Sequence, residues 1–423
     1  MHDSTMKPLH GGNGSGVARA CVAVLLLGTA VQAHAVEIDL RATFSPSALN
    51  PTARTFIDVT PISGICRNDP RVCPVGGRSF DLIFDLQYGP FVVGAPAEQQ
   101  ATFTLPRTWR TVTLTHVETG HSTQATWRAS LFGGRYVLPR PAGEITGVPG
   151  EANPHGRLWG GADWVNPPAG CSGTPYGSFS PTFYNFAWGL SAADASCSKR
   201  TNYDFESMRL DRVSIRYEME TPDPLAMLTG TYTGRLDLGI GPGQDFDFGT
   251  NATATDSQVT LNFTLEVAHD FQVVFPPAPE ARLMPKGGWL QWTDYGRVPA
   301  SLQQTVPFQL TSSGEFSLKM RCEHEAGTQC GIRNTDTQTV VPVQVATTLP
   351  SMHEMTTSQP AIDIGLVSEH SGQTAPRFAP RYYATGAHSS INVAVVGDPV
   401  KQMLDEGAAT WQGEVTVIFD AAP

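Results

Sequence analysis

The sequence predicts an all-β protein built from sandwiches of antiparallel strands. Apolar and polar residues alternate with a period of two along the chain, most cleanly in residues 259–267 and 213–219. Turn residues are frequent, with 41 glycines and 33 prolines. A helical pattern occurs only in residues 400–406, about two turns. Strands with one apolar and one polar face are what packed antiparallel sheets require.

Composition and charge exclude several classes of protein. The chain has 423 residues, which leaves room for two or three domains. Charged residues make up 16%, and hydrophobic residues make up 40%, enough to bury a core and to exclude wholesale disorder. The formal net charge of −11 argues against a nucleic-acid partner, because phosphate binding needs a basic face.

Further alternating segments continue the strand pattern to the end of the chain. They are residues 236–240, 316–320, 341–345, 391–395 and 415–419. Proline cannot donate a hydrogen bond to a neighbouring strand, so Pro342 predicts an edge strand at its position.

Residues 1–35 are predicted to form a secretory signal peptide. Lys7 and Arg19 precede a short apolar run, residues 20–27, and small residues flank His34 in Ala33-His34-Ala35. This pattern predicts cleavage before Val36. The alternative is an amino-terminal membrane anchor, but the run is shorter than the roughly 20 residues that span a bilayer.

Six cysteines remain after the predicted cleavage, and an even number in an exported chain predicts disulfides. Six cysteines allow 15 pairings. Their clustering favours sequential pairing, because short loops are the easiest to close. The predicted pairs are Cys66–Cys73, Cys171–Cys197 and Cys322–Cys330. A zinc site is the alternative, but no cluster has C-x-x-C spacing or paired histidines, so we expect no metal.

The domain division is predicted at a proline-rich segment. A strand runs into residues 275–279, of which three are proline, and such a segment is a rigid spacer. We therefore expect an amino-terminal domain over residues 36–275, a linker over 276–280 and a carboxyl-terminal domain over 281–423. Within the first domain, residues 139–181 lose the alternation and predict a functional loop or a surface insertion.

The sequence offers no catalytic constellation. Motifs for a serine nucleophile, a zinc peptidase and a phosphate-binding loop are missing. Asp245 and Asp247 resemble part of a calcium loop whose remaining ligands do not follow. We expect no enzymatic activity and no cofactor.

The end of the chain resembles the terminal strand of a bacterial pilin. In residues 411–421 a glycine is followed by alternating apolar residues up to an aromatic residue. The order of features upstream is similar to that of the CfaE/CblD family, the tip adhesins and pilus initiators of alternate-chaperone (class 5) fimbriae. The loop closed by Cys66 and Cys73 resembles the first disulfide loop of that family, and the one closed by Cys171 and Cys197 resembles the second.

This resemblance implies two immunoglobulin-like β-sandwiches, a receptor-binding adhesin domain followed by a pilin domain that lacks its final strand. A periplasmic chaperone and then a donor strand from the next subunit, the major pilin, complete such a domain. Val415, Val417 and Phe419 are expected beside the open groove, and the four residues after Phe419 are too few for another strand. The alternative is an ordinary core strand of a complete sandwich.

The predicted mature start can also form a strand. Residues 36–43 could serve as a donor extension, but Ile38 and Leu40 suit the first strand of the adhesin domain equally well. The second placement fits a tip subunit, which has no subunit ahead of it.

The receptor surface suggested by the resemblance is partly basic. Its nearest counterpart contains Arg107, Trp109 and Arg110, which could stack on a sugar and bind its hydroxyl or carboxylate groups. A second basic pair expected from the family has only Arg235 as a counterpart. Two alternatives stay open: an ordinary solvated strand edge, and a patch formed by Trp159, Trp164 and Trp188.

These observations together predict a fimbrial tip adhesin that initiates pilus assembly. We expect export through the periplasm and display at the cell surface. The expected partners are a chaperone, an outer-membrane usher, the major pilin and a host glycan or glycoprotein. The alternatives are a structural surface sandwich without a receptor, and a secreted carbohydrate-active enzyme with two carboxylates roughly 5–9.5 Å apart.

Overall fold

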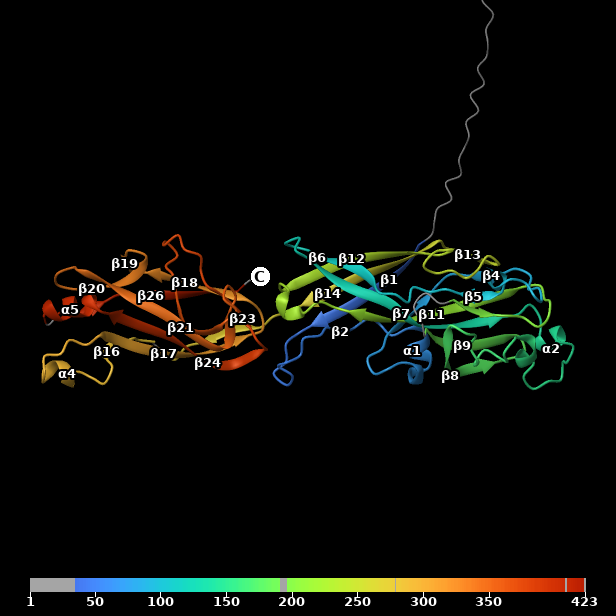
Figure 1. Cartoon of the computed structure of the whole chain (residues 1–423), viewed down its shortest axis with the longest axis horizontal. Helices are drawn as coiled ribbons and strands as arrows, with labels where there is room; N and C mark the ends of the chain where they lie inside the picture. The colour runs from blue at the N-terminus through green and yellow to red at the C-terminus, as the bar shows by residue number, and fades with distance from the viewer. Residues whose placement is uncertain (1–34, 191–195, 278, 408, 422–423) are drawn as a thin grey trace, which may run out of the picture. The chain divides into compact units, whose positions relative to one another are not determined.

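The computed structural model describes residues 35–190, 196–277, 279–407 and 409–421. Nearly all of the predicted signal peptide lies outside these residues. Strands dominate the described chain and form two 12-stranded sheets and one two-stranded sheet (Figure 1). The all-β prediction is confirmed.

The first sheet contains strands from the amino-terminal two thirds of the chain. In chain order they are β1 (Ala35–Phe44), β2 (Ile57–Asp58), β3 (Ser79–Leu82), β4 (Leu86–Tyr88), β6 (Arg110–His116), β7 (Ser122–Val137), β8 (Cys171–Phe179), β9 (Phe183–Leu190), β11 (Met208–Glu220), β12 (Gly230–Gly239), β13 (Ala252–Ala254) and β14 (Gln258–Val267). The main path runs β13-β4-β11-β7-β6-β12-β14-β1-β2. The two-stranded sheet pairs β5 (Ala101–Phe103) with β10 (Cys197–Lys199).

The strand β1 is an integral part of the first sheet. It pairs in parallel with β14 along its whole length, from Ala35 opposite Gln258 to Phe44 opposite Val267. Its inward side chains Leu40, Ala42 and Phe44 are buried. Of the two placements open for the mature start, the structure shows the first strand of the amino-terminal sandwich.

Aromatic side chains fill much of the core under the first sheet. Phe103 packs edge-on against Trp188 with ring centroids 5.7 Å apart, and Trp164 packs against Phe186 at 4.5 Å. All four are fully buried. Aromatic rings bury large apolar areas, which explains how a Gly- and Pro-rich stretch still builds a core.

The second sheet contains the carboxyl-terminal strands. They are β15 (Phe271–Val274), β16 (Met284–Pro285), β17 (Ser301–Ser312), β18 (Phe316–Cys322), β19 (His324–Ala326), β20 (Gln329–Asn334), β21 (Val340–Glu354), β22 (Pro360–Gly365), β23 (Arg377–Pro380), β24 (Ala384–Val396), β25 (Trp411–Gln412) and β26 (Val415–Ala421). The main path runs β15-β17-β24-β21-β23-β18-β26. These strands cover a separate core that includes Leu310, Leu318 and Val343.

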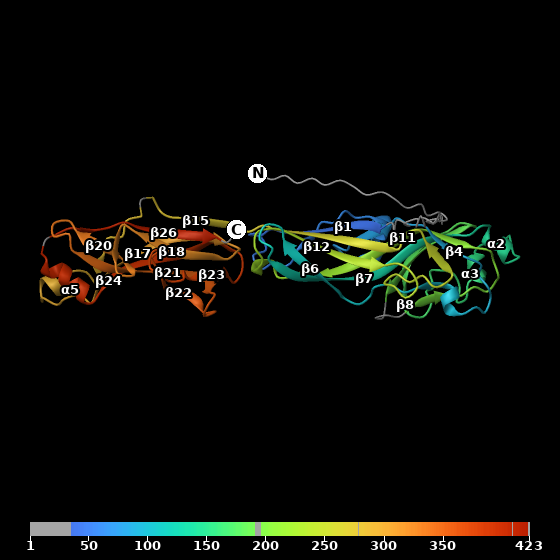
Figure 2. The same cartoon turned by 90° about the horizontal axis from the view of Figure 1, so that it is seen from above.

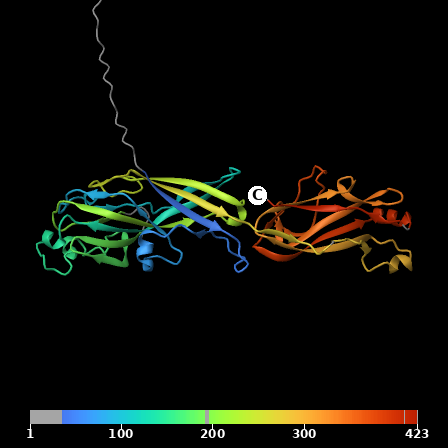
Figure 3. The same cartoon turned by 180° about the vertical axis from the view of Figure 1, so that it is seen from behind.

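The chain changes sheet before the proline-rich segment. The last strand of the first sheet ends at Val267, whereas β15 pairs with β17 in the second sheet. Figure 3 follows the chain from the blue-to-yellow strands of the first sheet to the second sheet, which runs from yellow through orange to red. The predicted limits of 36–275, 276–280 and 281–423 stay a prediction, and residues 268–270 are a better place for the division.

The prediction of an edge strand at Pro342 holds at that residue but does not extend to the strand as a whole. The long strand β21 pairs with β20, β22, β23 and β24, so it lies inside the sheet. Its pairing with β24 begins only at Gln344, whereas Pro342 pairs with Gly331 of β20. The proline is tolerated because one side of the strand is locally unpaired there.

The three predicted disulfides are confirmed. The Cα–Cα distances are 5.6 Å for Cys66–Cys73, 5.7 Å for Cys171–Cys197 and 5.1 Å for Cys322–Cys330.

The helices are short, and four of them were not expected from the sequence. They are α1 (Gly64–Asn68), α2 (Ala142–Ile145), α3 (His155–Leu158), α4 (Leu290–Thr293) and α5 (Asp398–Asp405). The helix α5 corresponds to the helical pattern predicted for residues 400–406.

Candidate functional site

The strand β26 has one unpaired edge among the described residues. All seven of its residues pair with β18, from Val415 opposite Cys322 to Ala421 opposite Phe316. No other described strand pairs with it, so it ends the main path of the second sheet. An unpaired edge presents backbone N–H and C=O groups to which another strand can bind.

The apolar side chains of β26 are incompletely covered. Phe419 lies opposite Leu318 and Val417 lies opposite Met320, so each pair shares one face of the sheet. Leu318 and Met320 are buried, whereas Val417 and Phe419 are only half-buried, and so is Val415. All three residues of β26 pack against the second core. The core is therefore closed over β18 and partly open over β26.

Phe419 joins a cluster of phenylalanines that connects β26 with the opposite end of the sheet path. Its ring centroid lies 5.7 Å from that of Phe308, 6.2 Å from Phe271 and 6.3 Å from Phe275 and Phe316. Phe271 begins β15, and Figure 2 shows β15 beside β26. No described backbone pairing joins these two end strands. We call β26, β15 and this cluster the open edge.

Gly413 precedes β26 for a steric reason. A Cβ atom at this position would lie 2.8 Å from the carbonyl oxygen of Gly331 in β20. Only glycine permits this close approach of the two backbones. The glycine that begins the pilin-like pattern therefore has a local structural role.

The sequence did not indicate that β15 belongs to the open edge. Phe271, Val273 and Phe275 contact the second core, and the residues between them are exposed. This alternation was a usable signal, but the following prolines suggested that the strand closed the first domain.

The three predicted receptor residues occupy different environments. Arg107 is buried, and its guanidinium donates to the carbonyl oxygen of Gly170 at 2.8 Å and to Cys197 Sγ at 3.1 Å. Trp109 is half-buried, with the guanidinium of Arg128 4.3 Å from its ring centroid. Arg110 donates to Asp245 Oδ1 at 2.9 Å. The three residues do not form one exposed patch, and receptor contact by any of them stays a prediction.

The alternative prediction, an exposed patch of tryptophans, is wrong. Trp159, Trp164 and Trp188 are fully buried. The Nε1–H of Trp188 donates to the carbonyl oxygen of Trp164 at 2.7 Å, and Trp159 stacks edge-on against Trp164 at 5.2 Å. The indoles of Trp159 and Trp164 pack with that of Trp188 from β9 in the core, because burying them contributes more than exposing them on a loop.

Two buried cations hold the insertion through its backbone. Lys199 Nζ donates to the carbonyl oxygens of Asp163 at 3.0 Å and Asn166 at 2.6 Å, and Arg107 binds that of Gly170. Burial lowers the pKa of Lys199 to about 8, against a smaller opposing effect of Asp163. These residues have structural partners that the sequence pattern could not identify.

Neither a metal cluster nor a membrane span is found in the described parts of the chain. No three His, Cys, Asp or Glu side chains gather there as a possible metal site. No helix among those residues is long and apolar enough to cross a bilayer.

The solved structures to which the chain is similar include tip adhesins of chaperone–usher fimbriae. A chaperone–tip adhesin complex of CFA/I fimbriae matches at 10% identity and a TM-score of 0.23, covering 92% of this chain and 97% of the other. A point mutant of the adhesin CfaE from enterotoxigenic E. coli matches at 8% identity and a TM-score of 0.25. The match covers 92% of this chain and 93% of the adhesin. The CsuC–CsuE chaperone–tip subunit complex from Acinetobacter baumannii matches at 8% identity and a TM-score of 0.20. The match covers 92% of this chain and 99% of the other.

No protein-family description and no curated protein sequence matches the chain. TM-scores below 0.5 carry no inference about function.

Proposed function

We propose that the chain is the tip adhesin of a bacterial fimbria, and that a strand from another protein completes its carboxyl-terminal sandwich at the open edge. The observation that carries this proposal is β26, whose Val415, Val417 and Phe419 are half-buried beside an unpaired backbone edge. A donated strand would add main-chain hydrogen bonds and cover these side chains. The resemblance of residues 411–421 to a terminal pilin strand supports the same function.

We infer the partners from the resemblance to fimbrial tip adhesins together with the open edge. A periplasmic chaperone would cover the open edge first, and the extension of the major pilin would replace it at an outer-membrane usher. The amino-terminal sandwich would carry the receptor site for a host glycan or glycoprotein. We infer export through the periplasm to the fimbrial tip, in a protein without catalytic activity or a cofactor.

Fusion of a donor strand tests the proposal. An alternating apolar strand from a candidate shaft subunit, linked flexibly after Pro423, should raise both the yield of soluble monomer and the thermal midpoint. Val417→Asp should abolish the gain, because a buried carboxylate replaces an apolar contact. Thr416→Asp is the matched control, because Thr416 is exposed on the same strand.

Two results would reject the proposal. The bare chain could already be a stable monomer that gains nothing from the fused strand. Alternatively, Val417→Asp and Thr416→Asp could reduce the gain in monomer yield and thermal midpoint equally. Either result would favour a structural surface sandwich that is complete without a partner.

A further inference from the structure

A cavity of about 520 Å³ opens beside the end of β11. Its walls are residues 54–56 and 58, the turn after the first disulfide at residues 74–78, and residues 216–221. This volume is in the range that holds small ligands. All of these residues belong to the amino-terminal part of the chain, whereas the strands of the open edge belong to the second sheet.

One wall of the cavity is the end of β11, where no described strand pairs with one of its two edges. The pairing of β3 with β11 ends where Arg216 lies opposite Ser79, and beyond it β11 pairs only with β7 among the described strands. The N–H of Tyr217 donates toward this side, to the carbonyl oxygen of Arg78 at 3.4 Å. Because backbone groups alternate along a strand, the N–H and C=O of Met219 face the same side.

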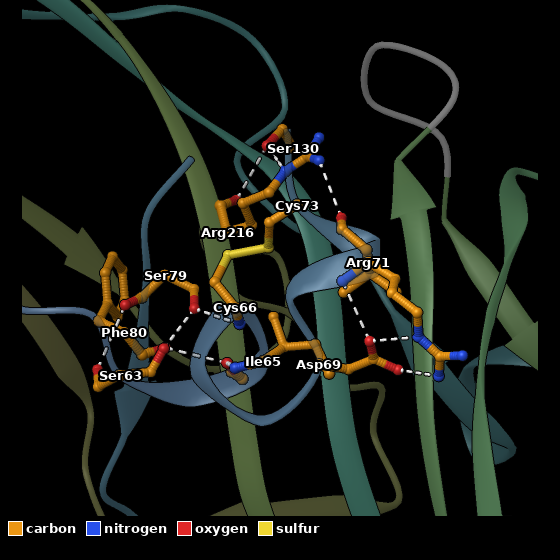
Figure 4. Close-up of a disulfide and its surroundings, with 12 residues drawn as sticks. Ser63, Ile65, Cys66, Asp69, Arg71, Cys73, Ser79, Phe80, Ser130 and Arg216 are labelled. Atoms are coloured by element: carbon orange, nitrogen blue, oxygen red, sulfur yellow. Dashed lines mark hydrogen bonds and ion pairs between the residues drawn. A yellow bond between two sulfur atoms is a disulfide. The ribbon is translucent and has the colours of Figure 1, made fainter. Parts of the chain in front are cut away.

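Arg216 is a half-buried cation in this wall, and among the described residues its hydrogen-bond partners are neutral. Its Nε–H donates to Ser130 Oγ at 2.9 Å and its Nη1 donates to the carbonyl oxygen of Val72 at 3.3 Å. The Cys66–Cys73 bridge closes the loop that carries Val72 (Figure 4). A guanidinium has five N–H donors, so three remain for a ligand.

No carboxylate pairs with Arg216 in the described parts of the chain. The other arginines in the cavity wall do have such partners: Arg54 lies 3.2 Å from Asp223 and Arg78 lies 4.0 Å from Asp58. The nearby Glu218 is held by Arg128 at 2.6 Å. Burial lowers the pKa of Arg216, with Glu218 acting in the opposite direction. A partly desolvated charge that is not balanced by an opposite charge is costly, and a bound anion would lower that cost.

The remaining carboxylate restricts where an anion can bind. Glu220 also lines the cavity and is exposed, but it lies four residues farther along β11, roughly 13 Å at the rise of a strand. The Arg216 end is therefore the cationic end. Val75, which is fully exposed, and the half-buried Phe56 and Met219 add apolar surface to the same cavity.

We propose that this cavity binds a ligand bearing a carboxylate, sulfate or phosphate group, and that Arg216 holds the anionic group. Guanidinium binds such oxyanions through paired, charge-assisted hydrogen bonds. The apolar residues would contact the body of the ligand.

Titrations at constant ionic strength test this proposal. The chain from Val36, with the fused donor strand if solubility requires it, is titrated with inorganic sulfate, inorganic phosphate, glucuronic acid and uncharged glucose. Binding of at least one oxyanion should reach saturation, whereas glucose should show no saturable binding. Tighter binding of glucuronic acid than of either inorganic ion would identify an acidic saccharide as the ligand, and the reverse order would identify a free anion.

Variants then locate the site. Arg216→Gln should weaken binding about tenfold, the effect of losing one charge-assisted contact. Arg41→Gln removes the same charge from an exposed side chain of β1 and should leave affinity unchanged. No saturation by any oxyanion, or equal losses in both variants, would overturn the proposal.

A second pair of variants avoids any effect of Arg216 on folding. Val75 is fully exposed, so a charged side chain there should not alter stability. Val75→Lys should strengthen oxyanion binding severalfold and Val75→Glu should weaken it. Unchanged affinity in both variants would show that the anion does not bind in this cavity.

Discussion

His155 is a fully buried imidazole with a hydrogen bond at each ring nitrogen. Its Nε2–H donates to the carbonyl oxygen of Ser180 at 2.8 Å, so Nδ1 accepts from the hydroxyl of Tyr136 at 2.6 Å. The Nε1–H of Trp159 donates to the same hydroxyl at 3.0 Å. Burial lowers the pKa of His155, although Ser180 and Asp163 act in the opposite direction. The neutral ring therefore connects the insertion to the core.

This arrangement predicts a specific acid sensitivity. Because the folded-state pKa of His155 lies below its unfolded value of about 6.5, its contribution to stability is present above pH 6.5 and is lost as the pH falls through the folded-state pKa. Denaturant unfolding between pH 7.5 and 5 should show the loss. His155→Gln should cost about 1–3 kcal/mol at pH 7.5 and flatten this pH dependence.

The exposed His121 provides the control. His121→Gln should keep the wild-type stability and the wild-type pH dependence. A His155→Gln protein with an unchanged pH dependence would contradict a buried neutral imidazole at this position.

The environments of single residues were the least predictable part of the molecule. The sequence suggested Arg107 as a surface contact, yet it is buried against the Cys171–Cys197 bridge. An exposed patch of Trp159, Trp164 and Trp188 was one of the alternatives, because a Gly- and Pro-rich stretch is typical of a loop. Their burial depends on long-range packing against Phe103 and Phe186, which no local pattern encodes.

At the scale of elements, β1 shows how one strand closes the amino-terminal sandwich. It covers β14 in parallel and buries Leu40 completely, while Asp39 is exposed. Leu40→Ala should destabilise this sandwich by about 2–5 kcal/mol, because it leaves a cavity in the core. Asp39→Ala should change stability by less than about 0.5 kcal/mol. Denaturant unfolding of both variants measures the difference.

Equal stability of the two β1 variants would contradict this placement. It would indicate that residues 36–43 pair elsewhere, as a donor extension would.

Strands whose pattern agrees with their packing were predictable from sequence. The alternation of residues 259–267 and 415–419 led directly to β14 and β26. The sheet to which β15 belongs was not predictable, because pairing with β17 is a non-local choice and the prolines that follow gave a stronger local signal. The disulfide pairs were predictable because each closes a short loop.

At the scale of the whole molecule, two sheets cover two separate cores. Calorimetry of the donor-fused chain should therefore resolve two unfolding transitions. The fused strand should raise the midpoint of only one of them, and Leu40→Ala should lower only the other. A single cooperative transition that responds to both changes would contradict independent sandwiches.

The most direct test of strand completion is hydrogen exchange along β26. We predict that amides in Val415–Ala421 exchange slowly in the donor-fused chain and much faster in a chain carrying a scrambled fusion, while amides of β14 exchange equally in both. Equal protection of β26 in the two chains would show that its edge takes no donor strand, and would contradict the proposed assembly function.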